Sequence, residues 1–258
     1  MNSLPMHRVV HISDTHMRAE DPGATRGWLA AARYIRETMP DLVVHTGDIV
    51  HDDPHDNRDH DFAARQLTRL GVDFLTVPGN HDIGDGPPAT LAPDRGLLES
   101  FCKRYSADRW EKQLGDWRLV GINTLLFSSG LAEEEEQWSW LADALHAGSR
   151  NPVVVFMHKP PFLISPDEGG EVSSVIPLAA RRRFWDLMRG SATTLIACGH
   201  RHEYRVLHRD GIQIVWAPTT SALLAEASPP LPPVAHPGMI EYVFAGATLL
   251  HRPVLVRD

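Results

Sequence analysis

Cysteine and long hydrophobic runs are both scarce in this sequence. Only Cys102 and Cys198 occur in 258 residues, which excludes a disulfide-based scaffold and indicates a reducing compartment. No apolar stretch approaches the ~18 residues needed to cross a bilayer, and the first residues lack the apolar segment of a signal peptide. We therefore expect a cytoplasmic protein that does not bind membranes.

Basic residues are fewer than acidic residues in this sequence. The chain has 25 lysines and arginines against 33 aspartates and glutamates, a formal net charge of −8, so a stable nucleic-acid complex is not expected. A content of 43% hydrophobic and 22% charged residues excludes disordered, coiled-coil and collagen-like chains. The length fits a single α/β domain covering residues 1–258.

Short apolar runs rich in β-branched residues alternate with segments of helical periodicity, which is typical of α/β proteins with largely parallel sheets. The pattern predicts strands at residues 8–13, 41–46, 72–77, 118–123, 152–157 and 193–197. It predicts helices at residues 25–39, 59–70, 133–147 and 177–189.

The C-terminal part of the chain has a different pattern of short runs joined by turns. It predicts strands at residues 204–208, 212–216, 240–244 and 248–256. We expect these strands to form a second, antiparallel sheet, with a hairpin turn at residues 209–211. Proline and glycine mark two loop insertions, near residues 84–96 and 225–239.

Fifteen histidines are the unusual feature of the composition, and many of them follow predicted strands. The polar residues at five strand ends are Asp14 and His16, then Asp48, then Asn80 and His81, then His158, and finally His200 and His202. In open α/β sheets, ligands bind outside the carboxyl ends of the strands. Side chains two residues apart in an extended segment point the same way, so Asp14 with His16, and His200 with His202, suit a metal ion. Glycines precede three of these positions, which allows a close approach of the backbone.

In this order, the motifs resemble the calcineurin-like metallophosphoesterase superfamily, whose pattern is D-x-H, G-D, G-N-H-[DE], H and G-H-x-H. The matching segments are Asp14-Thr15-His16, Gly47-Asp48, Gly79-Asn80-His81-Asp82, His158 and Gly199-His200-Arg201-His202. The first motif and the segment His158-Lys159-Pro160-Pro161 look like the bacterial cyclic-nucleotide and glycerophosphodiester phosphodiesterase branch. The resemblance implies a four-layer α/β-β/α sandwich of two mixed sheets, with a two-metal site at one edge.

The resemblance also implies the ligand set. One ion would be held by Asp14, His16, Asp48 and His202, and the other by Asp48, Asn80, His158 and His200. Asp48 would bridge the two ions. Such a mixed donor set accepts Mn²⁺, Fe²⁺, Co²⁺ or Zn²⁺, so the metal identity stays open. Two divalent ions at this spacing can hold a bridging hydroxide that attacks phosphorus.

Asn80 and His81 would bind the substrate, and His81 would protonate the leaving oxygen. The family often places an aspartate three residues after the bridging one to orient this histidine. This chain has His51 at that position, followed by Asp52 and Asp53, so the residue that supports His81 is left open.

We therefore predict hydrolysis of a small phosphate diester of the cyclic-nucleotide or glycerophosphodiester type. A phosphomonoesterase or nucleotidase that uses the same site is the main alternative. A non-catalytic scaffold of this fold is less favoured because all seven ligands are present. The Ser/Thr protein phosphatase branch is disfavoured because its G-D-x-x-D-R-G motif is not matched after Gly47. A homo-oligomer is left open, because the loops could reach a neighbouring subunit.

Several other polar residues have structural interpretations. His11 and His45 lie within apolar runs and are expected to be hydrogen-bonded core residues. Asp82 is expected to hold its loop or to orient an imidazole. The acidic, histidine-rich run 51–61 is interpreted as a solvated loop that leads to a helix N-cap at Asp59, rather than as a third metal site.

The sequence also suggests the surroundings of the basic and aromatic side chains near these motifs. Lys159 is expected to contact either phosphate or solvent. Trp138 and Trp140 are expected to pack rather than to stack on a base. Residues 181–183 are three arginines on a predicted helix, where they form a partly solvated face.

Overall fold

The computed structural model describes residues 5–51, 53–86, 91–146, 151–169, 173–221 and 237–256. The expected insertion at 225–239 lies mostly outside these ranges, as do residues 87–90 of the insertion at 84–96. None of the helices in the described ranges has the length and the apolar run that crossing a membrane requires.

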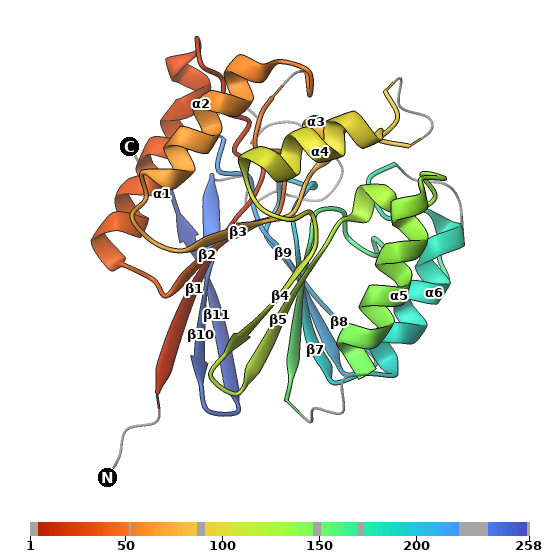
Figure 1. Cartoon of the computed structure of the whole chain (residues 1–258). Coiled ribbons are helices and arrows are strands. Elements are labelled where there is room, and N and C mark those ends of the chain that lie inside the picture. Colours follow the sequence, from red (N-terminus) through yellow and green to blue (C-terminus); the bar gives the residue numbers. More distant parts are fainter. Residues whose placement is uncertain are drawn as a thin grey trace.

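Eleven strands and six α-helices follow one another along the described chain (Figure 1). In the N-terminal half they are β1 (Met6–Ile12), α1 (Pro22–Thr38), β2 (Leu42–His45), α2 (Asn57–Thr68), β3 (Phe74–Thr76), α3 (Asn80–Ile83), α4 (Arg95–Arg104), β4 (Trp110–Leu114), β5 (Trp117–Ile122) and the 3₁₀ turn η1 (Thr124–Leu126). In the C-terminal half they are α5 (Ala132–His146), β6 (Val153–Met157), α6 (Leu178–Arg189), β7 (Thr193–Cys198), β8 (Arg205–Arg209), β9 (Ile212–Trp216), β10 (Gly238–Ala245) and β11 (Thr248–Leu255).

Two mixed sheets face each other in the centre of the molecule (Figure 1). The first sheet has the order β11-β10-β1-β2-β3, in which β1, β2 and β3 are parallel. The second has the order β4-β5-β6-β7-β9-β8, with four parallel strands between two antiparallel edge strands. The carboxyl ends of the parallel strands meet at one edge of the sandwich.

The expectation that the last four strands form a separate antiparallel sheet is wrong. β8 and β9 extend the second sheet, whereas β10 and β11 extend the first. β10 pairs antiparallel with β1, with Val9 opposite Tyr242. The hairpin at residues 209–211 is confirmed, because Arg209 pairs with Ile212 around a turn in which Asp210 and Gly211 both have positive φ.

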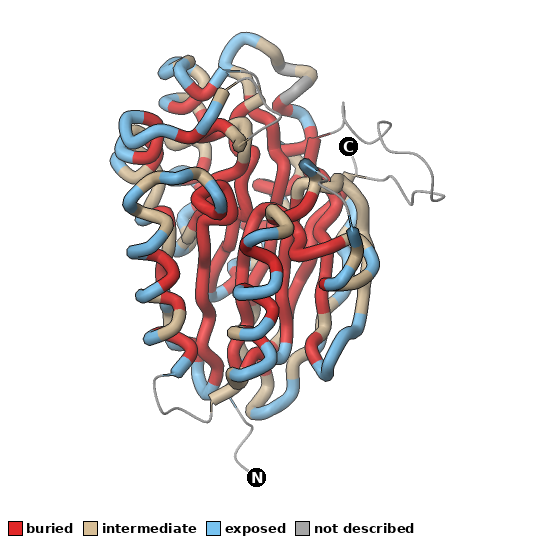
Figure 2. The backbone as a smooth tube through the Cα atoms, turned by 90° about the vertical axis from the view of Figure 1, so that its right-hand side faces the viewer, coloured by how far each residue is buried: buried red, intermediate tan, exposed pale blue. Residues whose placement is uncertain are grey.

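Three apolar cores separate four layers, which confirms the expected sandwich. α1 and α2 cover the outer face of the first sheet, and α5 and α6 cover that of the second (Figure 1). The third core lies between the sheets. In β6, Val154 faces this inner core and Val155 faces the helices, so both sides of the strand are buried. Figure 2 shows that the central strands are buried along nearly their whole length, which explains why they read as continuous apolar runs.

The four predicted helices match α1, α2, α5 and α6 to within three residues at each end. The sequence pattern missed α3, α4 and β4. α4 begins within the expected loop insertion, where the Asp94 carboxylate caps it by accepting a hydrogen bond from Leu97 N. The N-cap of α2 is Asp56 rather than Asp59, because the Asp56 carboxylate accepts the capping hydrogen bond from Arg58 N at 2.8 Å. The Asp59 carboxylate accepts a hydrogen bond from Ala19 N at 2.7 Å.

A buried carboxylate ties the outer edge of the first sheet to α1. Glu241 on β10 is 3% exposed, and its Oε1 accepts hydrogen bonds from Arg8 at 2.6 Å and from the Tyr34 hydroxyl at 3.1 Å. Its Oε2 accepts one from Arg252 Nε at 2.7 Å. Burial raises the pKa of Glu241, but the hydrogen bonds from Arg8, Arg252 and Tyr34 outweigh it and lower the pKa overall. The ionised carboxylate therefore stabilises the fold.

We expect Glu241→Gln to lower the free energy of unfolding by about 1–3 kcal/mol near neutral pH, because charged hydrogen bonds are lost. The folded-state pKa lies below the ordinary value of 4.5, so the contribution is complete above pH 4.5 and is lost as the pH falls through the folded-state pKa. The difference between wild type and variant should therefore shrink in acid. Urea unfolding as a function of pH measures it. A pH-independent difference would contradict this account. The exposed Glu135→Gln serves as control, with an expected change of at most about 0.5 kcal/mol.

Candidate metal centre

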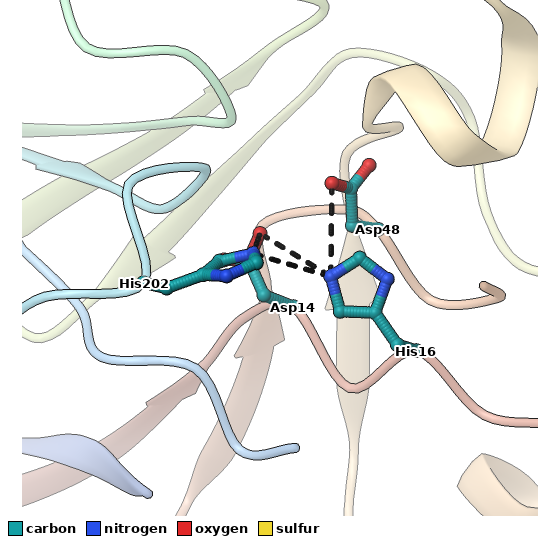
Figure 3. A group of neighbouring side chains, drawn as sticks. All are labelled: Asp14, His16, Asp48 and His202. Carbon is teal, nitrogen blue, oxygen red and sulfur yellow. Dashed lines mark hydrogen bonds and ion pairs between the residues drawn. The ribbon is translucent and has the colours of Figure 1, made fainter. Parts of the chain in front are cut away.

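The seven predicted ligands come together at the carboxyl edge of the two sheets. They follow the ends of β1, β2, β3, β6 and β7, and they form two groups that share Asp48. The first group is Asp14, His16, Asp48 and His202 (Figure 3). The second is Asp48, His158 and His200, with Asn80 beside His158. In each group of acidic and histidine residues, the ligand atoms lie within 4.8 Å of one another.

In the first group, one nitrogen of His16 faces the other three side chains (Figure 3). His16 Nε2 is 4.0 Å from Asp14 Oδ1 and 3.9 Å from Asp48 Oδ2. It is 3.2 Å from His202 Nε2, which in turn is 3.2 Å from Asp14 Oδ1. Two imidazole nitrogens and two carboxylate oxygens therefore converge on one point.

The second group converges in the same way on His158 Nε2. This atom lies 3.4 Å from Asp48 Oδ1, 3.1 Å from Asn80 Oδ1 and 3.1 Å from His200 Nδ1. The amide of Asn80 thus supplies an oxygen to this second group. The set combines imidazole, carboxylate and amide donors, which suits a divalent transition metal.

Strained backbone conformations hold several of these side chains in place. Asp14, His16, Asp48, His200 and His202 all have φ between 46° and 67°, the left-handed region that side chains other than glycine rarely adopt. Strain of this kind persists only where the surrounding structure enforces it, and it is common at functional sites. Here the enforcing structure is the pair of packed sheets beneath the loops.

Two glycines leave the room that the carboxylates occupy. A Cβ on Gly199 would lie 1.8 Å from Ser13 Oγ and 2.6 Å from Asp14 Oδ2. A Cβ on Gly79 would lie 2.2 Å from Asp48 Oδ1, although the φ of −104° at Gly79 is open to any residue. The requirement for glycine at position 79 is therefore steric.

Backbone groups fix the orientation of the ligands. His158 Nδ1 donates to Thr46 O at 2.7 Å, which leaves its Nε2 directed at the site. Asp14 Oδ2 accepts from His200 N at 3.0 Å, and Asp48 Oδ1 accepts from His81 N at 2.9 Å. Each carboxylate is thus bound by a loop from a different strand.

The charges of the buried side chains are interdependent. Burial opposes ionisation of Asp48 and Asp14, yet the nearby histidines, His158 and His202 above all, keep the pKa of both carboxyls low. Burial also opposes a charge on His158, but Asp48 outweighs it and raises the pKa of His158 to about 9. Burial lowers the pKa of His16 to about 3. Two buried carboxylates therefore attract positive charge to this site.

The site contains a buried acceptor oxygen that a cation would satisfy. Asp14 Oδ1 is fully buried, and among the described residues it has the ring nitrogen of His202 at 3.2 Å but no well-directed hydrogen bond. A buried carboxylate oxygen without a well-directed hydrogen bond is costly, and a divalent ion would satisfy it. The two groups of donor atoms also match the preferences of such ions. The residues present thus suit divalent metals.

His81 lies at the edge of the first group. Its ring meets that of His16 edge-on, with centroids 5.0 Å apart, and it is only partly buried. His51 stacks beside it, with centroids 6.0 Å apart and planes 13° apart. Among the described residues of the run 51–61, none belongs to either metal-binding group.

Two acidic residues near the site have structural partners. As expected, Asp82 holds its loop, since its carboxylate accepts hydrogen bonds from the backbone N of Ile49, at 2.9 Å, and of Gly79, at 2.8 Å. Lys159 is not a surface lysine but is buried, and its Nζ lies 2.6 and 2.7 Å from the carboxylate of Asp85. Sequence reasoning missed this ion pair because nothing local links residues 74 positions apart. It fastens the loop after α3 to the end of β6.

The buried, hydrogen-bonded positions expected for His11 and His45 are confirmed. His11 and His45 are fully buried, and their ring nitrogens contact Thr46 Oγ1 at 2.8 Å and Thr15 Oγ1 at 2.9 Å. Burial lowers the pKa of both histidines to about 3, so both are neutral core residues.

The expected packing roles of the aromatic residues are also confirmed, and the arginine run is only partly solvated. Trp138 is buried against Phe127, with ring centroids 4.5 Å apart, and Trp140 packs at the edge of the same core. Arg181 is fully buried and donates to Glu168 O at 2.9 Å, whereas residues 182 and 183 are exposed.

Known proteins resemble this chain over most of its length. A probable cyclic nucleotide phosphodiesterase of Moraxella catarrhalis is 26% identical over 230 residues, which cover 82% of this chain and 78% of that protein. A probable glycerophosphodiester phosphodiesterase, GpdQ, of Arcobacter nitrofigilis is 26% identical over 75% of this chain and 71% of its own length. The serine/threonine-protein phosphatase CPPED1 of Danio rerio is 28% identical over 69% of this chain and 59% of its own length.

The fold is shared with solved structures. A dimetal phosphatase from Danio rerio superposes with a TM-score of 0.66 at 16% identity, covering 98% of this chain and 97% of that one. The family model described as calcineurin-like phosphoesterase matches residues 7–204, which include all seven candidate ligands. The chain therefore belongs to the calcineurin-like phosphoesterase family and is a metal-dependent phosphoric ester hydrolase.

Proposed function

We propose that this protein hydrolyses a small phosphate diester, of the cyclic-nucleotide or glycerophosphodiester type, with the aid of two divalent metal ions. The observation that carries the proposal is the position of Asp48. Its Oδ1 faces His158 Nε2 at 3.4 Å, and its Oδ2 faces His16 Nε2 at 3.9 Å. One buried carboxylate thus serves both groups of ligands, which is the arrangement that a binuclear centre requires.

The proposed ligands divide between the two ions as the motifs imply. Asp14, His16, Asp48 and His202 would hold one ion, and Asp48, Asn80, His158 and His200 would hold the other. When bound, Mn²⁺, Fe²⁺, Co²⁺ or Zn²⁺ would stabilise charge on the phosphoryl oxygens and lower the pKa of the attacking water. The chain contributes the fixed geometry, because its ligands come from loops held by two packed sheets.

Asn80 and His81 are the proposed substrate-binding residues. His81 is bound through its backbone N to Asp48, so its ring is held next to the metal-binding groups while remaining partly exposed. From there its imidazole can donate a proton to the leaving oxygen as the ester bond breaks. A diester with a poor leaving group benefits most from such a general acid.

The relatives support the diester assignment, and one of them favours the alternative. Two are named as phosphodiesterases, for cyclic nucleotides and for glycerophosphodiesters. A third is named as a serine/threonine-protein phosphatase, and phosphoserine and phosphothreonine are chemically monoesters. A phosphomonoesterase that uses the same ligands is therefore the second candidate function.

The first experiment compares bis(p-nitrophenyl) phosphate with p-nitrophenyl phosphate, which share a leaving group. The purified chain is loaded in turn with each of the four metals. We expect a higher kcat/KM for the diester, because the site is proposed to accept a second ester group. A preference for the monoester would overturn the diester assignment and favour the second candidate.

Asp48→Asn is the control for this comparison. It removes one carboxylate charge that both ions share, so we expect loss of bound metal and of both activities. Two tightly bound ions and full activity in this variant would show that the ligand assignment is wrong. Absence of turnover in the wild type with every metal would favour a non-catalytic scaffold.

A second prediction concerns His81. We expect His81→Ala to keep two bound ions but to lose about 10²–10⁴-fold in kcat on a diester with an alkoxide leaving group. The loss should be much smaller with p-nitrophenolate, which leaves without protonation. Metal analysis and kinetics on both substrates measure this.

The leaving-group dependence separates a proton donor from a structural residue. An equal loss on both substrates would contradict general acid catalysis, and loss of metal would mean that His81 is a ligand. His146→Ala, at an exposed histidine that contacts Ala142 O at the end of α5, is the matched control.

A further inference from the structure

The imidazole of His51 lies against His16, which belongs to the first group of ligands. His51 occupies the position where the family often has an aspartate that orients the histidine of the G-N-H motif, which here is His81. In the structure, the Nδ1 of His51 faces His16 and not His81. His51 Nδ1 is 3.5 Å from Nδ1 of His16, and the two rings are nearly perpendicular at 88°. Between the two described residues His51 and His81 there is a ring contact but no hydrogen bond.

The two nitrogens of His16 have different environments. Nε2 points at Asp14, Asp48 and His202, as Figure 3 shows, so a metal ion would bind there. A neutral imidazole that offers a lone pair on Nε2 carries its proton on Nδ1. That proton requires an acceptor, and His51 Nδ1 is within hydrogen-bond distance.

The second group shows what such an acceptor does. His158 Nδ1 donates to the backbone carbonyl of Thr46 at 2.7 Å, which fixes both the tautomer and the ring orientation. Metal-binding histidines generally have a partner of this kind, and removing it typically weakens metal binding about 10–100-fold. For His158 the acceptor belongs to the backbone and no substitution can remove it. For His16 the acceptor is a side chain.

We propose that His51 is a positioning residue of the metal centre. It accepts a hydrogen bond from Nδ1–H of His16 and so holds Nε2 of His16 toward Asp14 and Asp48. Its effect is on the affinity of the ion in the first group, while the second group is held independently through Thr46. This inference rests on the proposed function, since it assumes that both groups bind divalent ions.

Two substitutions distinguish the hydrogen bond from the ring contact with His81. His51→Asn places an amide near the Nδ1 position and keeps an acceptor, but it removes the ring. His51→Phe keeps a ring beside His81 but removes the acceptor. The full chain is stripped of metal with a chelator and titrated with Mn²⁺ or Zn²⁺ in competition with a coloured chelator. Bound metal is therefore measured without reference to activity.

We expect His51→Phe to weaken one of the two sites about 10–100-fold and to leave the other unchanged. His51→Asn should remain within about threefold of the wild type at both sites. Unchanged affinities in His51→Phe would overturn the inference. So would equal weakening in both variants, because the ring rather than the acceptor would then be responsible. If circular dichroism shows that His51→Phe is unfolded, His51→Ala takes its place.

The wild-type titration separates this inference from the proposed function. Binding of two ions by the wild type, together with unchanged affinities in His51→Phe, overturns only the role of His51. Failure of the wild type to bind a second ion under any condition overturns the binuclear centre itself, and with it this inference.

Discussion

The candidate metal centre depends on one buried carboxylate that its two groups of side chains share. Asp48 is almost fully buried, and such a charge is costly unless opposite charge and hydrogen bonds surround it. His158, whose pKa Asp48 raises, and the backbone N of His81 supply part of that compensation. Divalent ions would supply the rest. The fold therefore maintains a concentration of negative charge that attracts cations.

The rest of the architecture keeps that carboxylate in place. The inner core joins the two sheets, so that loops after β1 and β2 meet loops after β6 and β7. Glycine at 79 leaves room for Asp48, and the strained backbone at the ligand positions is enforced by the strands below. The Lys159–Asp85 ion pair adds a connection between the second sheet and the loop beyond α3. Rigidity at this edge is thus a product of the packing of both sheets.

Local patterns in the sequence predicted most elements but not all their partners. Four helices and the hairpin at residues 209–211 were predictable, because periodicity and turn residues report local conformation. α4 was missed because its apolar stripe of Leu97, Leu98 and Phe101 is short and follows a proline-rich stretch. The placement of β10 beside β1 could not be predicted, because an apolar run identifies a strand but not its neighbour.

The sequence by itself determined the order and chemical type of the candidate ligands, since each follows an apolar strand and sits in a short motif. Tertiary structure alone decided which atoms face one another: the two oxygens of Asp48 toward separate groups, Lys159 toward Asp85, and the Nδ1 of His51 toward His16 rather than His81. The physical reason is that conformation and burial are encoded within a few residues, whereas contacts between distant side chains follow from how two sheets pack.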